Sequence, residues 1–239
     1  AGRPRRCYPE FVNLAFGRPV TASSTCGEQG PERYCKLVGR TEQGKKCDYC
    51  DARDPRRSHP AENLTDGNNP GNPTWWQSEP LSNGPQNVNL TLDLGKEFHL
   101  TYVILKFCSP RPSLAILERS DFGKTWQPYQ YFSSDCRRTF GRPPRGPITK
   151  GNEQEVLCTS EYSDIVPLEG GEIAFSTLEG RPSATDFDNS PVLQEWVTAT
   201  NIRVRLTRLN TLGDDLMDKR DPEVTRSYYY AISDIAVGG

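Results

Sequence analysis

The chain has 239 residues, of which 34% are hydrophobic, and it contains 20 glycines and 20 prolines. This length suits one all-β domain, and we treat residues 1–239 as a single domain. Lys and Arg number 29 against 31 for Asp and Glu, so there is no overall positive field to attract nucleic acid. The sequence has no run of roughly 20 apolar residues, as a membrane-spanning helix needs, which argues against membrane insertion.

Alternation of apolar and polar residues predicts a series of strands. Residues 88–94 place Val, Leu, Leu and Leu on one face, and Gly95 is expected to end that strand. Residues 100–107 are apolar at both odd and even positions, which is typical of a central strand covered on both sides. Residues 113–119 and 127–132 flank a turn (DFGK) and are expected to form an antiparallel hairpin. Further strands are predicted at 173–177, 202–208 and 228–237.

One helix is predicted in the last quarter of the chain. Ser190 can cap it and Pro191 suits its first position. Its apolar side is expected to consist of Val192, Leu193, Trp196 and Val197. Residues 51–87 and 137–153 are dense in Pro, Asn and Gly and predict ordered surface loops. Together these elements predict an all-β, antiparallel β-sandwich of the jelly-roll type with few short helices.

Eight cysteines stand at positions 7, 26, 35, 47, 50, 108, 136 and 158, five of them in the first fifty residues. Their density predicts N-terminal loops stapled by disulfides, and the sequons at Asn63 and Asn89 are candidate glycosylation sites. Both features indicate a protein secreted into the extracellular matrix. Zinc is the main alternative for Cys35, Cys47 and Cys50, but no second CxxC follows, so disulfides are favoured.

Residues 63–74 (NLTDGNNPGNPT) are the best candidate for a ligand site. Asp, Thr, Asn and turn carbonyls supply hard oxygen atoms around a bend at Gly67, and calcium takes six to eight such ligands. The spacing is not that of an EF-hand, so an ordinary Asn/Gly/Pro loop is the alternative.

Other features point more weakly to function. Basic residues cluster at 3–6, 56–57, 137–145 and 203–205 and could bind heparan sulfate, although such clusters are commonly solvated surface. The aromatics Trp75, Trp76, Trp126, Trp196 and residues 228–230 could form a sugar platform, but core packing explains most of them. The sequence lacks a GxSxG elbow, a phosphate-binding Gly-Lys loop and an HExxH motif, so an enzyme is not expected.

Long motifs distributed along the chain resemble the laminin N-terminal domain family. They are residues 6–13 (RCYPEFVN), 74–78 (TWWQS), 175–184 (FSTLEGRPSA), 189–196 (NSPVLQEW) and 229–234 (YYAISD). Within this family, residues 22–26 (ASSTC), 107–112 (FCSPRP) and 147–154 (PITKGNEQ) look like the secreted netrins, whereas Trp75-Trp76 and the sequon at Asn89 look like a laminin γ chain.

The resemblance implies a galactose-binding-like jelly roll with EGF-like repeats following it in the longer protein. It also implies the disulfides Cys26–Cys50, Cys35–Cys47 and Cys136–Cys158. A structural calcium is implied at the 63–74 loop. Its ligands would be the side chains of Asp66 and Thr74, main-chain oxygens near Leu64 and Asn69, and Ser233.

Two cysteines depart from the family pattern. Netrins carry a cysteine at the position of Trp75 that bridges to the counterpart of Cys108, and the usual partner of Cys7 lies upstream of this chain. Cys7 and Cys108 are therefore expected to be free thiols, with pairing to each other or between chains as alternatives.

The first functional hypothesis is a netrin-like guidance cue that binds cell-surface receptors of the immunoglobulin superfamily, such as neogenin. The second is the short-arm tip of a laminin γ chain, which joins other laminin N-terminal domains in a calcium-dependent network. A lectin-like module that binds glycans is the third.

Overall fold

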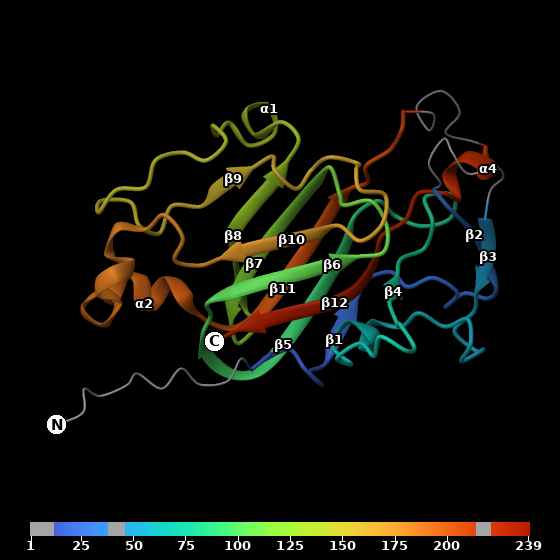
Figure 1. The fold of residues 1–239 in the computed structure, drawn as a ribbon, viewed down its shortest axis with the longest axis horizontal. Coiled ribbons are helices and arrows are strands. Elements are labelled where there is room, and N and C mark those ends of the chain that lie inside the picture. Colours follow the sequence, from blue (N-terminus) through green and yellow to red (C-terminus); the bar gives the residue numbers. More distant parts are fainter. Residues whose placement is uncertain (1–11, 38–45, 214–220) are drawn as a thin grey trace.

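The computed structural model describes residues 12–37, 46–213 and 221–239. Two β-sheets face each other in a sandwich, and a separate two-stranded ribbon lies at one end, opposite helix α2 (Figure 1). The larger sheet has the order β1-β5-β11-β7-β8-β9, the smaller one β10-β6-β12-β4, and the ribbon is β2-β3. Most neighbouring strands are antiparallel, as predicted, but β9 pairs with β8 in parallel.

The strands are β1 (Val20–Ala22), β2 (Glu32–Lys36), β3 (Lys46–Cys50), β4 (Trp76–Gln77), β5 (Val88–His99), β6 (Tyr102–Phe107), β7 (Leu114–Asp121), β8 (Thr125–Ser133), β9 (Leu157–Thr159), β10 (Glu172–Ser176), β11 (Thr198–Arg208) and β12 (Ala231–Gly238). The short helices are η1 (Ala61–Leu64), α1 (Cys136–Phe140), η2 (Pro182–Asn189), α2 (Pro191–Val197) and α4 (Pro222–Thr225). In the described residues there is no helix long and apolar enough to cross a membrane.

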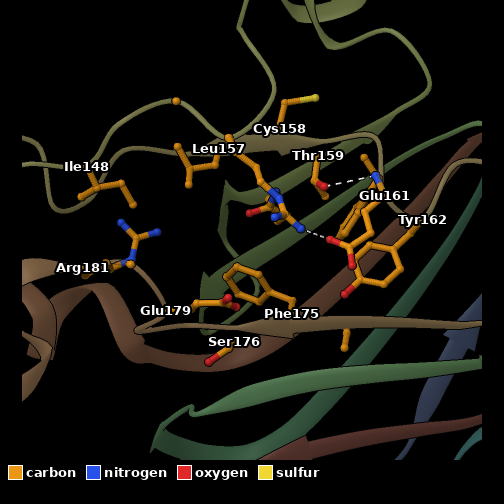
Figure 2. Close-up of a pocket in the computed structure, with 16 residues that line it drawn as sticks. Ile148, Leu157, Cys158, Thr159, Glu161, Tyr162, Phe175, Ser176, Glu179 and Arg181 are labelled. Atoms are coloured by element: carbon orange, nitrogen blue, oxygen red, sulfur yellow. Dashed lines mark hydrogen bonds and ion pairs between the residues drawn. The ribbon is translucent and has the colours of Figure 1, made fainter.

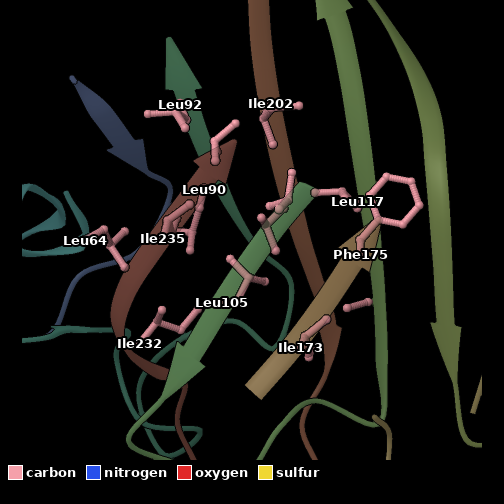
Figure 3. Packing of buried hydrophobic residues seen from close by; sticks show 14 of the residues in the cluster. Leu64, Leu90, Leu92, Leu105, Leu117, Ile173, Phe175, Ile202, Ile232 and Ile235 are labelled. Atoms are coloured by element: carbon pink, nitrogen blue, oxygen red, sulfur yellow. The ribbon is translucent and has the colours of Figure 1, made fainter. Parts of the chain in front are cut away.

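The core lies between the two sheets and is built from alternate residues of each strand. Leu90 and Leu92 of β5 and Ile202 of β11 face Leu105 of β6 and Ile235 of β12 (Figure 3), and all five are at most 4% exposed. Burial of one such side chain contributes roughly 1.5–3 kcal/mol. The apolar residues at every second position, which predicted these strands, are therefore the ones that form the core.

Two strand predictions need correction. Gly95 does not end β5, which continues to His99. With φ at +79°, Gly95 lies in an irregular stretch where Thr200 of β11 faces the segment between Asp93 and Phe98. The strand at 102–107 is central in its sheet, as predicted, but Lys106 is exposed, so the strand is covered fully on one side only.

The helix at 190–197 is present, and the Ser190 hydroxyl accepts a hydrogen bond from Leu193 N, as the cap requires. Val192, however, is 48% exposed and does not belong to its buried side. The prediction of one helix was too low: the described residues contain four other short helices, which lie in Pro-rich or loop segments without helical periodicity.

Candidate functional site

The loop after η1 is tied to the closing strand β12 by a compact set of hydrogen bonds. Asn68 donates from its side-chain nitrogen to the main-chain oxygen of Ser233, 2.9 Å away, and to that of Thr74, 3.4 Å away. The Thr74 hydroxyl lies 2.5 Å from Asp66 Oδ2 and donates to it. Three of the five residues expected to hold calcium, Asp66, Thr74 and Ser233, are therefore joined around one asparagine.

The other two expected ligand positions lie differently. Leu64 is fully buried and packs in the core. Asn69 forms a turn of its own, in which its main-chain oxygen accepts a hydrogen bond from Asn72 N at 3.0 Å. The hydrogen bonds in the structure thus bring together Asp66, Thr74 and Ser233. The roles of the Leu64 and Asn69 carbonyls as calcium ligands stay predictions.

The chemistry of this loop fits a hard cation. A carboxylate, a hydroxyl and main-chain carbonyls are the ligand types that calcium prefers. Burial, and to a smaller extent the Asp66 carboxylate, raise the pKa of the neighbouring Asp234, while Lys106 acts in the opposite direction. Asp66 and Asp234 therefore lie close enough for their carboxylates to interact, with Lys106 partly offsetting their charge.

Three disulfides hold the loops around the sandwich: Cys26–Cys50, Cys35–Cys47 and Cys136–Cys158. They are the pairs that the family resemblance implies. Cys35 and Cys47 face each other directly across the β2–β3 ribbon. Cys47 and Cys50 belong to different bridges, so the CxxC segment offers no pair of thiolates to zinc.

Cys108 lies outside any disulfide and is half-buried, and Trp75 packs against the same small apolar cluster. Burial raises the pKa of its thiol above the ordinary value, with Glu169 adding to the effect and Ser233 and Lys36 opposing it. A neutral thiol reacts slowly. Cys7 lies outside the described residues.

A groove of about 430 Å³ runs beside the candidate calcium loop. Pro73 and Ser233 border it from the loop and from β12, and Cys108 and Trp75 line it further along. The indole of Trp75 also stacks on His59, with ring centroids 4.2 Å apart. The loop and the groove therefore form one continuous surface.

A second cavity, of about 350 Å³, was not foreseen from the sequence (Figure 2). It lies by β8, β9 and β10, where Ile148 and Leu157 face Phe175 across the opening and an ion pair joins Arg145 to Glu161. Its lining comes from four separate segments between residues 130 and 181, so no single stretch of the sequence carries a signal for it.

Arg181, at the edge of this cavity, has a structural role. Only 5% of it is exposed, and its guanidinium lies 4.0 Å from the Trp196 ring and donates to the main-chain oxygens of Thr177, Glu153 and Glu155. Burial is the main cause that lowers its pKa to about 10. It is a cation satisfied by carbonyls and an aromatic face.

The basic clusters that could bind heparan sulfate are largely paired within the chain. Arg203 and Arg205 both contact the buried carboxylate of Glu118, and Arg142 pairs with Glu155. The Arg203 and Arg205 guanidiniums, which face a buried carboxylate, are therefore less available to sulfate groups. The cluster at 3–6 lies outside the described residues.

The two sequons differ in environment. Asn89 is exposed on β5, on the outward side of the larger sheet, and its side chain is accessible to glycosylation. The side-chain nitrogen of Asn63, which would carry the glycan, instead donates to Trp75 O at 2.9 Å in a half-buried position. Occupancy of either site stays a prediction.

The aromatic residues considered for a sugar platform also differ in their exposure to solvent. Trp76, Trp196, Tyr228 and Tyr230 are at most 2% exposed and belong to the core. Trp75 and Trp126 are partly exposed, and Trp126 is covered by the Arg203 guanidinium, 4.3 Å from its ring. Core packing is therefore the main role of this set.

The family model "Laminin N-terminal (Domain VI)" matches residues 7–239. The chain is 57% identical to laminin subunit gamma-1 of Danio rerio over 242 residues and of Homo sapiens over 243, and 54% identical to laminin subunit gamma-3 of Mus musculus over 243. These alignments cover 99–100% of this chain and 15% of each relative.

Among solved structures, the chain is similar to chitosan-binding module 1 of a Paenibacillus sp. IK-5 chitosanase/glucanase, with 15% identity and a TM-score of 0.47. That alignment covers 95% of this chain and 99% of the module. A module from a Clostridium perfringens family 31 glycoside hydrolase has 14% identity and a TM-score of 0.46, with 96% and 94% coverage.

Proposed function

The chain belongs to the laminin N-terminal (domain VI) family, and from this premise we propose that it forms the short-arm tip of a laminin γ-type chain. In this role it binds the N-terminal domains of other laminin chains and does not catalyse a reaction. Membership of the family identifies it as a secreted protein of the extracellular matrix. The observation that carries the proposal is the match to laminin γ subunits over the whole chain.

The proposal places the laminin γ hypothesis ahead of the netrin hypothesis, which the sequence motifs had favoured. The netrin-like motifs placed a guidance cue first, but the relatives reported above are laminin γ subunits at 54–57% identity. The chain spans about 15% of their length, so the network-forming activity of the whole protein is inferred for it.

The proposal includes a structural calcium at the 63–74 loop. Asp66, Thr74 and Ser233 are gathered by Asn68, and the loop borders the groove that contains Trp75. An ion bound there would fix the loop against β12 and so keep this exposed surface in one conformation. The groove is the part of the surface that we expect a partner domain to contact.

The test is a binding assay with the purified domain. We expect binding to laminin α and β short-arm tips in millimolar calcium and weaker binding in EDTA. We expect no saturable binding to ectodomains of netrin-type receptors. Binding to the receptors alone would overturn the proposal and restore the guidance-cue hypothesis.

A substitution can locate the contact surface. Lys106 is exposed, lines the groove and is not a calcium ligand in this proposal. We expect Lys106→Glu to weaken binding to the laminin tips by at least threefold, while Lys124→Glu, on the opposite sheet at the β7–β8 turn, leaves it unchanged. Equal affinities for the two variants would exclude the groove as the contact.

A further inference from the structure

Asn68 makes more contacts in the candidate calcium loop than any expected ligand residue described above. Its side-chain oxygen accepts a hydrogen bond from Thr74 N at 3.1 Å, and its own backbone nitrogen donates to Asp66 Oδ1 at 3.0 Å. Its side-chain nitrogen reaches the main-chain oxygens of Thr74 and Ser233. One residue thus contacts the Asp66 carboxylate, both main-chain polar groups of Thr74 and the closing strand.

The backbone of Asn68 is consistent with this role. Its φ is +40°, a left-handed conformation that asparagine adopts far more readily than most residues with a side chain. Glycine would accept this conformation and keep the backbone hydrogen bond to Asp66, but it would supply none of the three side-chain hydrogen bonds. Only a short side chain with a donor and an acceptor at fixed spacing can hold Thr74 N and Ser233 O together.

From these contacts we propose that Asn68 is a positioning residue, which sets the calcium-binding oxygens in place before the ion binds. The inference rests on the proposed calcium site. A carbonyl oxygen has two lone pairs, so Ser233 O can accept from Asn68 and still face an ion. The Thr74 hydroxyl is positioned less directly, through the hydrogen bonds that Asn68 makes with the main-chain nitrogen and oxygen of Thr74. The Asp66 carboxylate is likewise oriented through Oδ1, which accepts from Asn68 N.

The physical effect is on the entropy of binding. Without Asn68 the loop and β12 would have to be brought together at the moment when calcium binds, and this ordering reduces the affinity. With Asn68 part of that ordering occurs when the domain folds. Groups that orient metal ligands in this way change metal affinity by about 10- to 100-fold when they are removed.

The test is calcium titration of three proteins by calorimetry, together with their melting temperatures in EDTA. Asn68→Gly keeps the left-handed backbone accessible and removes only the side chain. Asn72→Ala is the matched control, because Asn72 is an exposed asparagine of the same loop that bonds through its backbone nitrogen. Circular dichroism establishes that each variant is folded.

We expect Asn68→Gly to weaken calcium binding by about 10-fold and to lower the melting temperature in EDTA, where no ion is bound. Asn72→Ala should do neither. If Asn68→Gly is unfolded, Asn68→Asp is used, in which the donor to Ser233 and Thr74 is lost while the size is kept, and a lower melting temperature in EDTA is again expected.

Two outcomes contradict the inference in different ways. If the unmodified domain binds calcium and Asn68→Gly binds it equally or more tightly, Asn68 is not a positioning residue, and tighter binding would mean that its amide competes with the ion. If the unmodified domain binds no calcium, the proposed calcium site itself is wrong.

Discussion

At the scale of single residues, the clearest departure from the netrin pattern is the pair Trp75 and Cys108. The indole stands where netrins carry the bridging cysteine, and it packs against the same apolar cluster as the thiol it leaves unpaired. The indole and the thiol also line the same groove, and burial raises the pKa of the thiol above its ordinary value.

This arrangement predicts the outcome of a thiol titration. In the denatured, unreduced protein we expect two reactive thiols, those of Cys7 and Cys108, and Cys108→Ser should reduce the count to one. In the native protein the Cys108 thiol should react slowly, because burial raises its pKa. A count of zero in a monomer would mean that the two cysteines are bonded to each other.

His59 gives a prediction for pH. Burial lowers the pKa of its imidazole from 6.5 to about 4, against the opposing effects of Asp48 and of a hydrogen bond with the Trp75 backbone. The unfolded chain therefore binds a proton at a higher pH than the folded one. His59 contributes stability above about pH 6.5, and this contribution is lost as the pH falls toward 4.

Urea unfolding between pH 7.5 and 4.5 measures this effect. We expect a loss of roughly 1–3 kcal/mol from His59, since one pKa unit corresponds to about 1.4 kcal/mol. His59→Gln should lose less over the same range, because the variant has no imidazole to protonate. Parallel pH profiles for the two proteins would show that His59 is not buried as a neutral group.

At the scale of elements, the β2–β3 ribbon differs from the sandwich in how it is stabilised. Two strands alone are marginal in water. This ribbon packs on a small cluster of Tyr34, Tyr229, Ala231 and the buried Cys26–Cys50 bridge, apart from the main core. We therefore expect disulfide bonds to contribute more to the stability of the ribbon than to that of the two large sheets.

Removal of single bridges checks this difference. Cys26→Ala/Cys50→Ala should lower the free energy of unfolding by about 3 kcal/mol, and hydrogen exchange should show loss of protection in β2 and β3 while the central strands β5 and β11 stay protected. The Cys136–Cys158 bridge closes a loop of similar length (sequence separation 22 against 24). Its removal in Cys136→Ala/Cys158→Ala should leave the ribbon protected. Uniform loss of protection in both variants would contradict a separately stabilised ribbon.

At the scale of the whole molecule, the proposed calcium site connects a loop from the first third of the chain to the last strand. Asp66 and Thr74 on one side and Ser233 on the other are more than 150 residues apart, and β12 lies at the centre of the smaller sheet beside β6. An ion bound there would stabilise the folded domain as a unit, because the unfolded chain cannot gather these ligands.

Removal of calcium should therefore lower the melting temperature of the domain. At a calcium concentration 100 times the Kd, binding contributes about 2.7 kcal/mol, which corresponds to roughly 5–10 °C for a domain of this size. Differential scanning calorimetry in calcium and in EDTA measures the shift. Asp66→Asn should abolish the calcium dependence, and an unmodified domain that melts at the same temperature in both buffers would argue against the site.

The class of fold and the positions of most strands follow from the order of residues along the chain. Apolar and polar residues alternate strictly in β5 and β11, because each of these strands has one face in the core and one in water, and this pattern predicts a strand. The sequence also contained a true capping serine at Ser190 and motifs specific enough to imply the family and the three disulfides, while the calcium that these motifs also imply stays a prediction. It misplaced the end of β5, because a glycine that ends many strands here occupies an irregular stretch within one.

The contacts between distant residues follow instead from the folded arrangement. It placed Trp75 beside Cys108, buried Glu118 between Arg203 and Arg205, and brought Asn68 to Ser233. Each of these contacts joins elements that are remote in the chain and adjacent only through the order of strands in the sheets. The alternation of residues along a strand indicates which face is buried, but it does not indicate which strand lies next to it. The residues of the candidate calcium site could therefore be placed together only from the folded structure.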